Sequence, residues 1–227
     1  MNIQHVIHIH KQDRWGWFYV PALILFLAFL VSILISLIIT SNDEIYSGSI
    51  SSIFVYIFVM GILVIAQTYP FAIGMSVTRK DYFFGTLLMA VTVNIIIGAL
   101  LSLFAYLESY TNGWGINLHF FHFPYVNDGH FFEQLFMYVI LLTFLFFSGF
   151  LMSSYFYRFG GKGVLILAVV VLLAGSITSF LLTHLQMWQD LFLWFSSKPA
   201  VVLSYWLLPF ILLSLILSFW MLRKTPV

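Results

Sequence analysis

Histidine is the residue type best suited to bind a metal in this chain, because the sequence contains no cysteine. His5, His8 and His10 lie near the amino terminus, and neutral imidazole is a common zinc ligand. No cysteine or carboxylate completes this group at the spacing of a known metal motif. The sequence therefore favours an ordinary amphipathic segment here over a metal site.

A second group of histidines lies between residues 108 and 133, in a stretch rich in aromatic side chains. His119, His122 and His130, together with Asp128, offer the nitrogen and oxygen ligands of a zinc site. Their irregular spacing and aromatic neighbours are also typical of a loop at a membrane interface. The loop is the favoured interpretation and the zinc site is the alternative, so we assign no metal ligands.

The sequence lacks the patterns that mark enzyme active sites. It contains no H-E-x-x-H and no G-x-S-x-G. Gly161-Lys162 resembles the end of a phosphate-binding loop, but Phe156 stands where the first glycine must be and Gly163 replaces the hydroxyl residue. We therefore expect a protein without a catalytic site or a bound cofactor of its own.

Arg79, Lys80 and Asp81 form a run of three charges between two long apolar stretches, with Tyr82 directly after it. Arginine is costly in hydrocarbon, so this run must lie at a membrane surface. Gly85 marks the beginning of the next apolar stretch. We predict a short, structured loop over residues 76–85, on the side of the membrane that collects positive charge.

The composition places the chain in a membrane. Hydrophobic residues make up 62% of it and charged residues only 7%, whereas soluble domains carry about 25% charged residues. A crossing helix needs about 20 apolar residues, and six stretches qualify: residues 17–39, 51–75, 86–107, 133–157, 164–185 and 200–222. We predict an all-α integral membrane protein with six transmembrane helices in a single domain, residues 1–227.

The lysines and arginines distinguish the two sides of this predicted bundle. With both termini in the cytoplasm, that side holds every one of the nine except Lys198. Most acids fall on the outer side: Asp43, Glu44, Glu108, Asp128, Glu133 and Asp190. With an odd number of spans, the basic residues would be divided between the two sides. We therefore predict a multi-pass protein of the cell membrane with both ends inside. The net charge of +1 indicates no nucleic-acid partner.

Two short amphipathic segments accompany the spans. Residues 1–16 have apolar positions close to helical spacing and are predicted to form a helix on the inner leaflet, with a strand as the alternative. Residues 186–199 are predicted to form a short helix in the outer interface. Its apolar face consists of Trp188, Leu191, Phe192 and Phe195. Anchoring is the simple interpretation of this helix, and a lid over an exit path is the functional one.

Small and polar residues recur at four-residue intervals in the third span, at Asn94, Gly98 and Ser102. Such a stripe lets helices approach closely in lipid, so packing is favoured, with a substrate path as the alternative. No Asp, Glu, Lys or Arg falls in the middle of any predicted span, which disfavours an ion-coupled pump. If the protein does work, a partner must supply the energy.

The pattern Pro70-Phe71-x-x-Gly74-x-x-x-x-Arg79-Lys80-x-Tyr82-x-x-Gly85-Thr86 resembles the first cytoplasmic loop of the type-2 ABC exporter permease family, in its small Gram-positive members. The predicted topology resembles that of the family over the whole chain. In the family this loop carries a coupling helix, so the resemblance implies that Arg79, Lys80, Asp81 and Tyr82 contact an ATPase. The predicted helix before the last span resembles the outer re-entrant helices of the family, although it is shorter.

The resemblance implies a permease subunit that works with separate ABC ATPase subunits, which would bind the ATP, and with a second permease, identical or not. Membrane lipid surrounds it. The substrate would be an amphipathic molecule moved out of the cell: a peptide such as a lantibiotic or toxin, a lipid or a drug. One alternative is the six-span substrate-binding subunit of a vitamin importer, which couples to its motor through another membrane protein and needs no charged loop. Another is a membrane scaffold or sensor that transports nothing.

Overall fold

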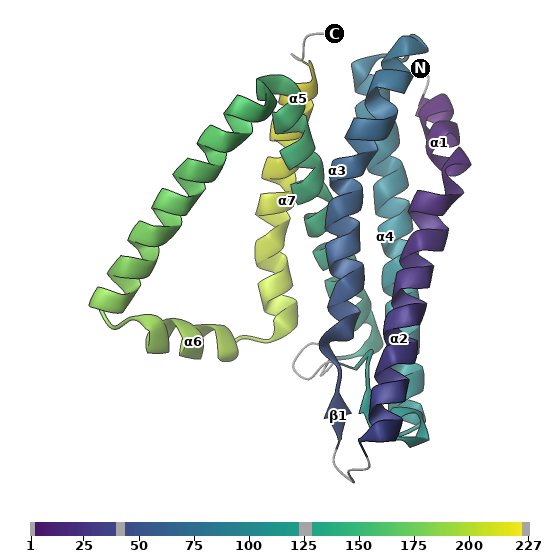
Figure 1. The fold of residues 1–227 in the computed structure, drawn as a ribbon, viewed down its shortest axis with the longest axis vertical. Helices are drawn as coiled ribbons and strands as arrows, with labels where there is room; N and C mark the ends of the chain where they lie inside the picture. Colours follow the sequence, from purple (N-terminus) through teal and green to yellow (C-terminus); the bar gives the residue numbers. More distant parts are fainter. Residues whose placement is uncertain (1–2, 40–43, 123–128, 224–227) are drawn as a thin grey trace.

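The structure is a computed structural model that describes residues 3–39, 44–122 and 129–223 (Figure 1). Within these ranges, five helices are long and apolar enough to cross a membrane. They are α2 (Val20–Ile38), preceded by a π-helical turn at Trp15–Tyr19, α3 (Ser51–Gly74), α4 (Arg79–Tyr110), α5 (Phe131–His184) and α7 (Ala200–Arg223). The shorter elements include α1 (Ile3–Gln12), α6 (Trp188–Ser196) and two strands that pair in parallel, β1 (Ile45–Tyr46) and β2 (Leu118–His119). The predicted all-α membrane class is confirmed at this level.

The predicted fourth and fifth spans lie within one element, α5, which is 54 residues long. The helix breaks at Gly160, where φ is 67° and ψ is −174°. This backbone conformation is almost restricted to glycine. Figure 1 shows the two arms of α5, residues 131–159 and 161–184, diverging from the break, with the second arm and α6 standing away from the other helices.

The first arm of α5 is the centre of the bundle and packs against α3, α4 and α7. It crosses α3 at a reciprocal pair of glycines. A Cβ atom at Gly61 would lie 2.1 Å from the carbonyl oxygen of Phe146, and one at Gly149 would lie 2.1 Å from that of Phe58. Because lipid gives apolar helices no hydrophobic reason to associate, close packing of this kind holds them together.

Helix α1 packs against the beginning of α4. Val6 is fully buried against Gly85, where a Cβ atom would lie 2.7 Å from the valine side chain. His10 is also buried, and its Nε2 pairs with the hydroxyl of Thr86 at 2.9 Å. Burial lowers the pKa of His10 to about 4, so the ring is neutral at pH 7. In α1 a valine and a histidine are the buried residues, whereas the three isoleucines are half-buried.

The two ends of the bundle differ in what they carry. Figure 1 shows the first and last described residues at one end, together with the α3–α4 junction and the break in α5. The paired strands and α6 lie at the opposite end. Arg79, Arg158 and Arg223 therefore share one end, as the sequence pattern predicts for the cytoplasmic side.

The glycine crossing yields the first prediction. Replacing Gly61 with alanine forces α3 and α5 apart, because the new Cβ would overlap a backbone carbonyl that cannot rotate away. We expect Gly61→Ala to lower the free energy of unfolding by about 2–3 kcal/mol. Thermal unfolding in detergent micelles, followed by tryptophan fluorescence, measures this loss.

Gly175→Ala is the matched control, since a Cβ atom at Gly175 would meet nothing within 4 Å. This change replaces a helical glycine with a better helix former, so stability should stay the same or rise slightly. Equal losses in the two variants would show that the crossing is not what holds α3 to α5.

Candidate functional site

The junction between α3 and α4 is short and tightly built. Only residues 75–78 join the two helices. The backbone N–H of Val77 donates to the carbonyl of Ala72 at 3.1 Å. The Thr78 hydroxyl accepts from the backbone N–H of Asp81, also at 3.1 Å, and so caps α4. Most of the predicted loop 76–85 is therefore the first part of α4. The junction itself is short and is hydrogen-bonded to both helices.

The three charged residues of the junction lie in different surroundings. Lys80 is exposed, whereas Arg79 and Asp81 are half-buried. Arg79 Nη1 donates to the backbone carbonyl of Arg223 at 2.7 Å. This bond satisfies a carbonyl at the end of α7, where helical partners are missing, and ties α4 to α7. Lys80 is thus the cation of this run that is most open to another protein.

Arg158 makes a second connection at the same end of the bundle. Its guanidinium lies over the ring of Trp220 in α7, 4.0 Å from the centroid, an arrangement typical of a cation–π contact. Arg158 comes shortly before the break at Gly160. The position of the break is therefore fixed against α7, while the second arm of α5 continues beyond it.

The sequence predicts Tyr82 at the contact surface, and the structure corrects this. The side chain of Tyr82 is completely buried. Its hydroxyl lies 2.8 Å from Thr68 Oγ1 and 3.2 Å from the carbonyl oxygen of Val64, and both partners belong to α3. Tyr82 faces α3 because it lies one turn inside α4. It holds the two helices of the junction together and is not available to a partner.

Asn94, Gly98 and Ser102 lie in the seam between α4 and the first arm of α5, and all are buried. A Cβ atom at Gly98 would lie 2.8 Å from the side chain of Val139. Asn94 Nδ2 is 3.5 Å from Thr143 Oγ1, and the Ser102 hydroxyl donates to the carbonyl of Gly98 at 2.9 Å. This geometry favours the packing interpretation of the stripe.

Helix α6 carries the predicted outer apolar face. Trp188, Phe192 and Phe195 are exposed, and Leu191 is half-buried. The indole N–H of Trp188 donates to Thr183 Oγ1 at 3.0 Å, which links α6 to the end of α5. Exposed aromatic residues on a short helix are what a segment lying in the membrane interface presents to lipid.

Glu108 organises the loop that follows α4, a role that sequence reasoning missed. The side chain is completely buried at the end of α4. Its Oε2 accepts from the Trp114 indole N–H and from the backbone N–H groups of Phe120 and Phe121, at 3.0, 3.0 and 2.8 Å. Its Oε1 accepts from the backbone N–H of His122 at 2.8 Å. A buried carboxylate is tolerated when it is bonded in this way, and here it fixes the path of the loop.

His119 and His122 lie beside the same carboxylate. The ring of His119 stacks on Tyr46 at 4.8 Å, and its Nδ1 lies 3.6 Å from Glu108 Oε1. His122 Nδ1 pairs with the hydroxyl of Ser109 at 3.3 Å. Among the residues that the structure describes, no three metal-binding side chains gather at one point. Asp128, the carboxylate of the alternative zinc site, lies outside the described residues.

The hydrogen bonds to Glu108 yield the second prediction. In Glu108→Gln one oxygen is replaced by an NH₂ group, which faces backbone N–H donors and cannot accept from them. We expect a loss of about 2–3 kcal/mol in the free energy of unfolding. We also expect faster hydrogen exchange at the amides of residues 120–122, measured by mass spectrometry.

Glu133→Gln is the matched control for this change. Glu133 is exposed and accepts from the backbone N–H of His130 at 3.0 Å, a bond that glutamine can keep. This variant should lose less than about 1 kcal/mol. Unchanged exchange at residues 120–122 in Glu108→Gln would show that the carboxylate does not hold the loop.

Comparisons of the chain with protein-family models, with curated proteins and with solved structures gave no match. The function proposed below therefore rests on the residues of this chain and their geometry.

Proposed function

We propose that this protein is the membrane-spanning permease subunit of an ATP-driven exporter, with ATP hydrolysis in a separate ABC ATPase subunit. The α3–α4 junction carries the proposal. It is short, it is fixed to both helices by Tyr82 and the Thr78 cap, and it presents Lys80 to solvent. A loop with these properties can transmit a push on its surface to two membrane helices at once.

The proposal includes six crossings with both termini in the cytoplasm. Residues 161–184 continue as a helix beyond the break at Gly160 and rise about 36 Å, enough for the roughly 30 Å hydrocarbon core. Lys162 lies at one end of this arm and the amphipathic α6 at the other. Two crossings within α5 keep every basic residue except Lys198 on one side, in accord with the positive-inside rule.

The energy source is placed in a partner because the chain offers none of its own. The middle of each proposed span is free of Asp, Glu, Lys and Arg, the residues from which proton and sodium relays are built. The buried polar side chains Asn94 and Ser102 form packing bonds between or within helices. An ABC ATPase that acts on the junction from the cytoplasm would supply the energy that the bundle itself has no means to provide.

The proposed complex contains two permease subunits. The second arm of α5 exposes apolar residues along its length, such as Leu172 and Phe180, which are 69% and 67% exposed. Lipid or another permease must cover such a surface. Two bundles can enclose a path between them, and we propose that an amphipathic peptide, lipid or drug moves outward along it.

Charge reversal at Lys80 tests the proposed coupling. In Lys80→Glu we expect at least a tenfold loss of affinity for the ABC ATPase that is co-expressed with the permease, because a rim cation becomes repulsive to its partner. Pull-down of the purified pair in detergent and ATP hydrolysis in liposomes measure this loss. Lys80 is exposed and makes no contribution to the core, so the variant should fold normally.

Lys198→Glu is the control, since it makes the same change at an exposed cation on the opposite end. This variant should bind the ATPase as the unaltered protein does. Two results would contradict the proposal: failure of the unaltered permease to bind any ABC ATPase from its own genome, or equal binding by Lys80→Glu.

A further inference from the structure

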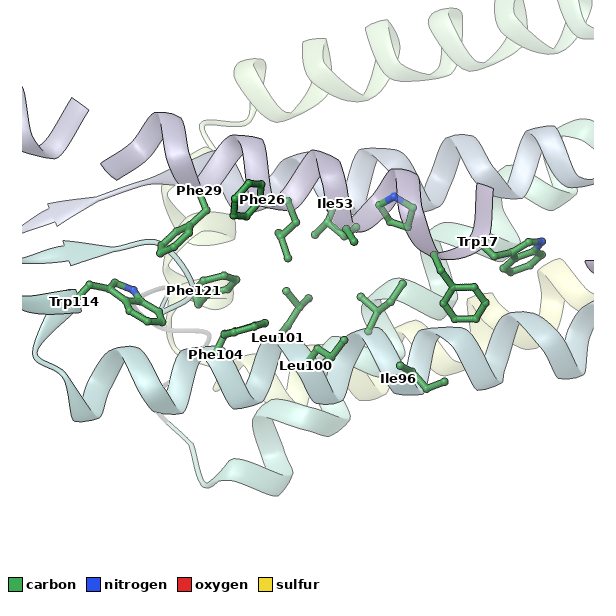
Figure 2. A pocket seen from close by; sticks show the side chains of 15 residues that line it. Trp17, Phe26, Phe29, Ile53, Ile96, Leu100, Leu101, Phe104, Trp114 and Phe121 are labelled. Carbon is green, nitrogen blue, oxygen red and sulfur yellow. The ribbon is translucent and has the colours of Figure 1, made fainter. Parts of the chain in front are cut away.

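An apolar cleft of about 540 Å³ lies between α2 and α4. Figure 2 shows side chains of the two helices facing each other across it, including Phe26 and Phe29 from α2 and Leu100 from α4. Trp114 and Phe121, from the loop that Glu108 organises, lie at its outer end. The two helices do not close on each other here, so an apolar space remains within the bundle.

A second cavity, of about 420 Å³, continues this cleft toward the cytoplasmic end. The two cavities share the lining residues Phe18 and Ile96, so they adjoin at this pair, and together they are called the groove. Lys11 and Arg14 line the second cavity, and both side chains are exposed. The groove therefore has a cationic mouth and an apolar interior.

In the part of the chain that the structure describes, the carboxylate nearest in sequence forms no ion pair with either cation of this mouth. Asp13 lies between the two cations in the chain, but its Oδ1 accepts from the backbone N–H of Gly16 at 3.2 Å. Asp13 is not among the residues that line either cavity. The mouth is thus built to attract an anion.

We propose that this groove binds one anionic phospholipid of the cytoplasmic leaflet. The headgroup phosphate lies between Lys11 and Arg14, where cations near a membrane surface attract anionic lipids. One acyl chain passes Phe18 and Ile96 and enters the cleft. The cleft follows the π-helical turn and α2 from Trp17 to Phe29, about 18 Å, which is close to the depth of one leaflet.

The charge of the mouth favours a lipid over a helix of a second copy. A phospholipid joins an anionic headgroup to an apolar chain, which matches a cationic mouth beside an apolar cleft of about 540 Å³. A single acyl chain is thin enough to enter, and the cationic mouth supplies a reason for an anionic headgroup.

Lipid binding by the full-length protein tests the proposal. Native mass spectrometry in detergent would measure the affinity for dioleoyl phosphatidylglycerol and for dioleoyl phosphatidylcholine. We expect one phosphatidylglycerol to bind at least tenfold more tightly than phosphatidylcholine. The double variant Lys11→Gln, Arg14→Gln should lose this preference, whereas Lys198→Gln should keep it.

A second variant tests the cleft separately from its mouth. Ala22 is exposed and lines the cleft, so Ala22→Trp fills it without entering the core. This variant should lose binding of both lipids at least tenfold, and Leu172→Trp on the second arm of α5 should not. Unfolding midpoints within a few degrees of the unaltered protein show that each variant is folded.

Four results would overturn the proposal. They are equal affinity of the unaltered protein for the two lipids, an unchanged preference in the double variant, displacement of the lipid by millimolar glycerol 3-phosphate, and unchanged lipid binding in Ala22→Trp. The third would indicate a site for free phosphate. The fourth, if accompanied by a shift from dimer to monomer, would show that a second copy covers the cleft.

Discussion

The close crossing of α3 and α5 is the constraint on which the other contacts depend. In lipid, helices associate through close packing. Because Gly61 and Gly149 have no Cβ atom, the backbone of each helix can lie in the space that a Cβ on the other would occupy. The first arm of α5 then presents its remaining faces to α4, at Gly98 and Val139, and to α7. The α3–α4 junction, the Arg79 bond to α7 and the α2–α4 cleft all take their positions from this one crossing.

The end of the bundle that carries Arg79, Arg158 and Arg223 combines rigid joints with one site of freedom. Tyr82 joins α4 to α3, Arg79 joins α4 to α7, and Arg158 joins α5 to α7. Beyond Arg158 the chain breaks at Gly160, and the second arm of α5 leaves the bundle. A force applied at the junction therefore reaches four helices together. The second arm is the part of the described chain best placed to move relative to them.

Sequence reasoning predicted the all-α membrane class, because length and composition alone determine which segments can cross a membrane. It failed where the outcome depends on the path of the backbone. Tyr82 turns inward because α4 begins at its Thr78 cap, earlier than expected, and this turns the tyrosine toward α3. The role of Glu108 comes from the backbone N–H groups of the following loop, which converge on its carboxylate. The cleft between α2 and α4 is likewise a property of packing, with no signal in either helix alone.

The number of crossings is tested most directly by cysteine labelling, for which this cysteine-free chain is a ready background. An impermeant maleimide would be applied to intact cells that carry Ser47→Cys, Lys162→Cys or Ser197→Cys. The six-crossing arrangement predicts labelling at positions 47 and 197, and labelling at 162 only after the membrane is permeabilised. Two results would contradict the six-crossing arrangement: labelling at 162 in intact cells, or protection at 197. Either would mean that the second arm of α5 does not cross the membrane as proposed.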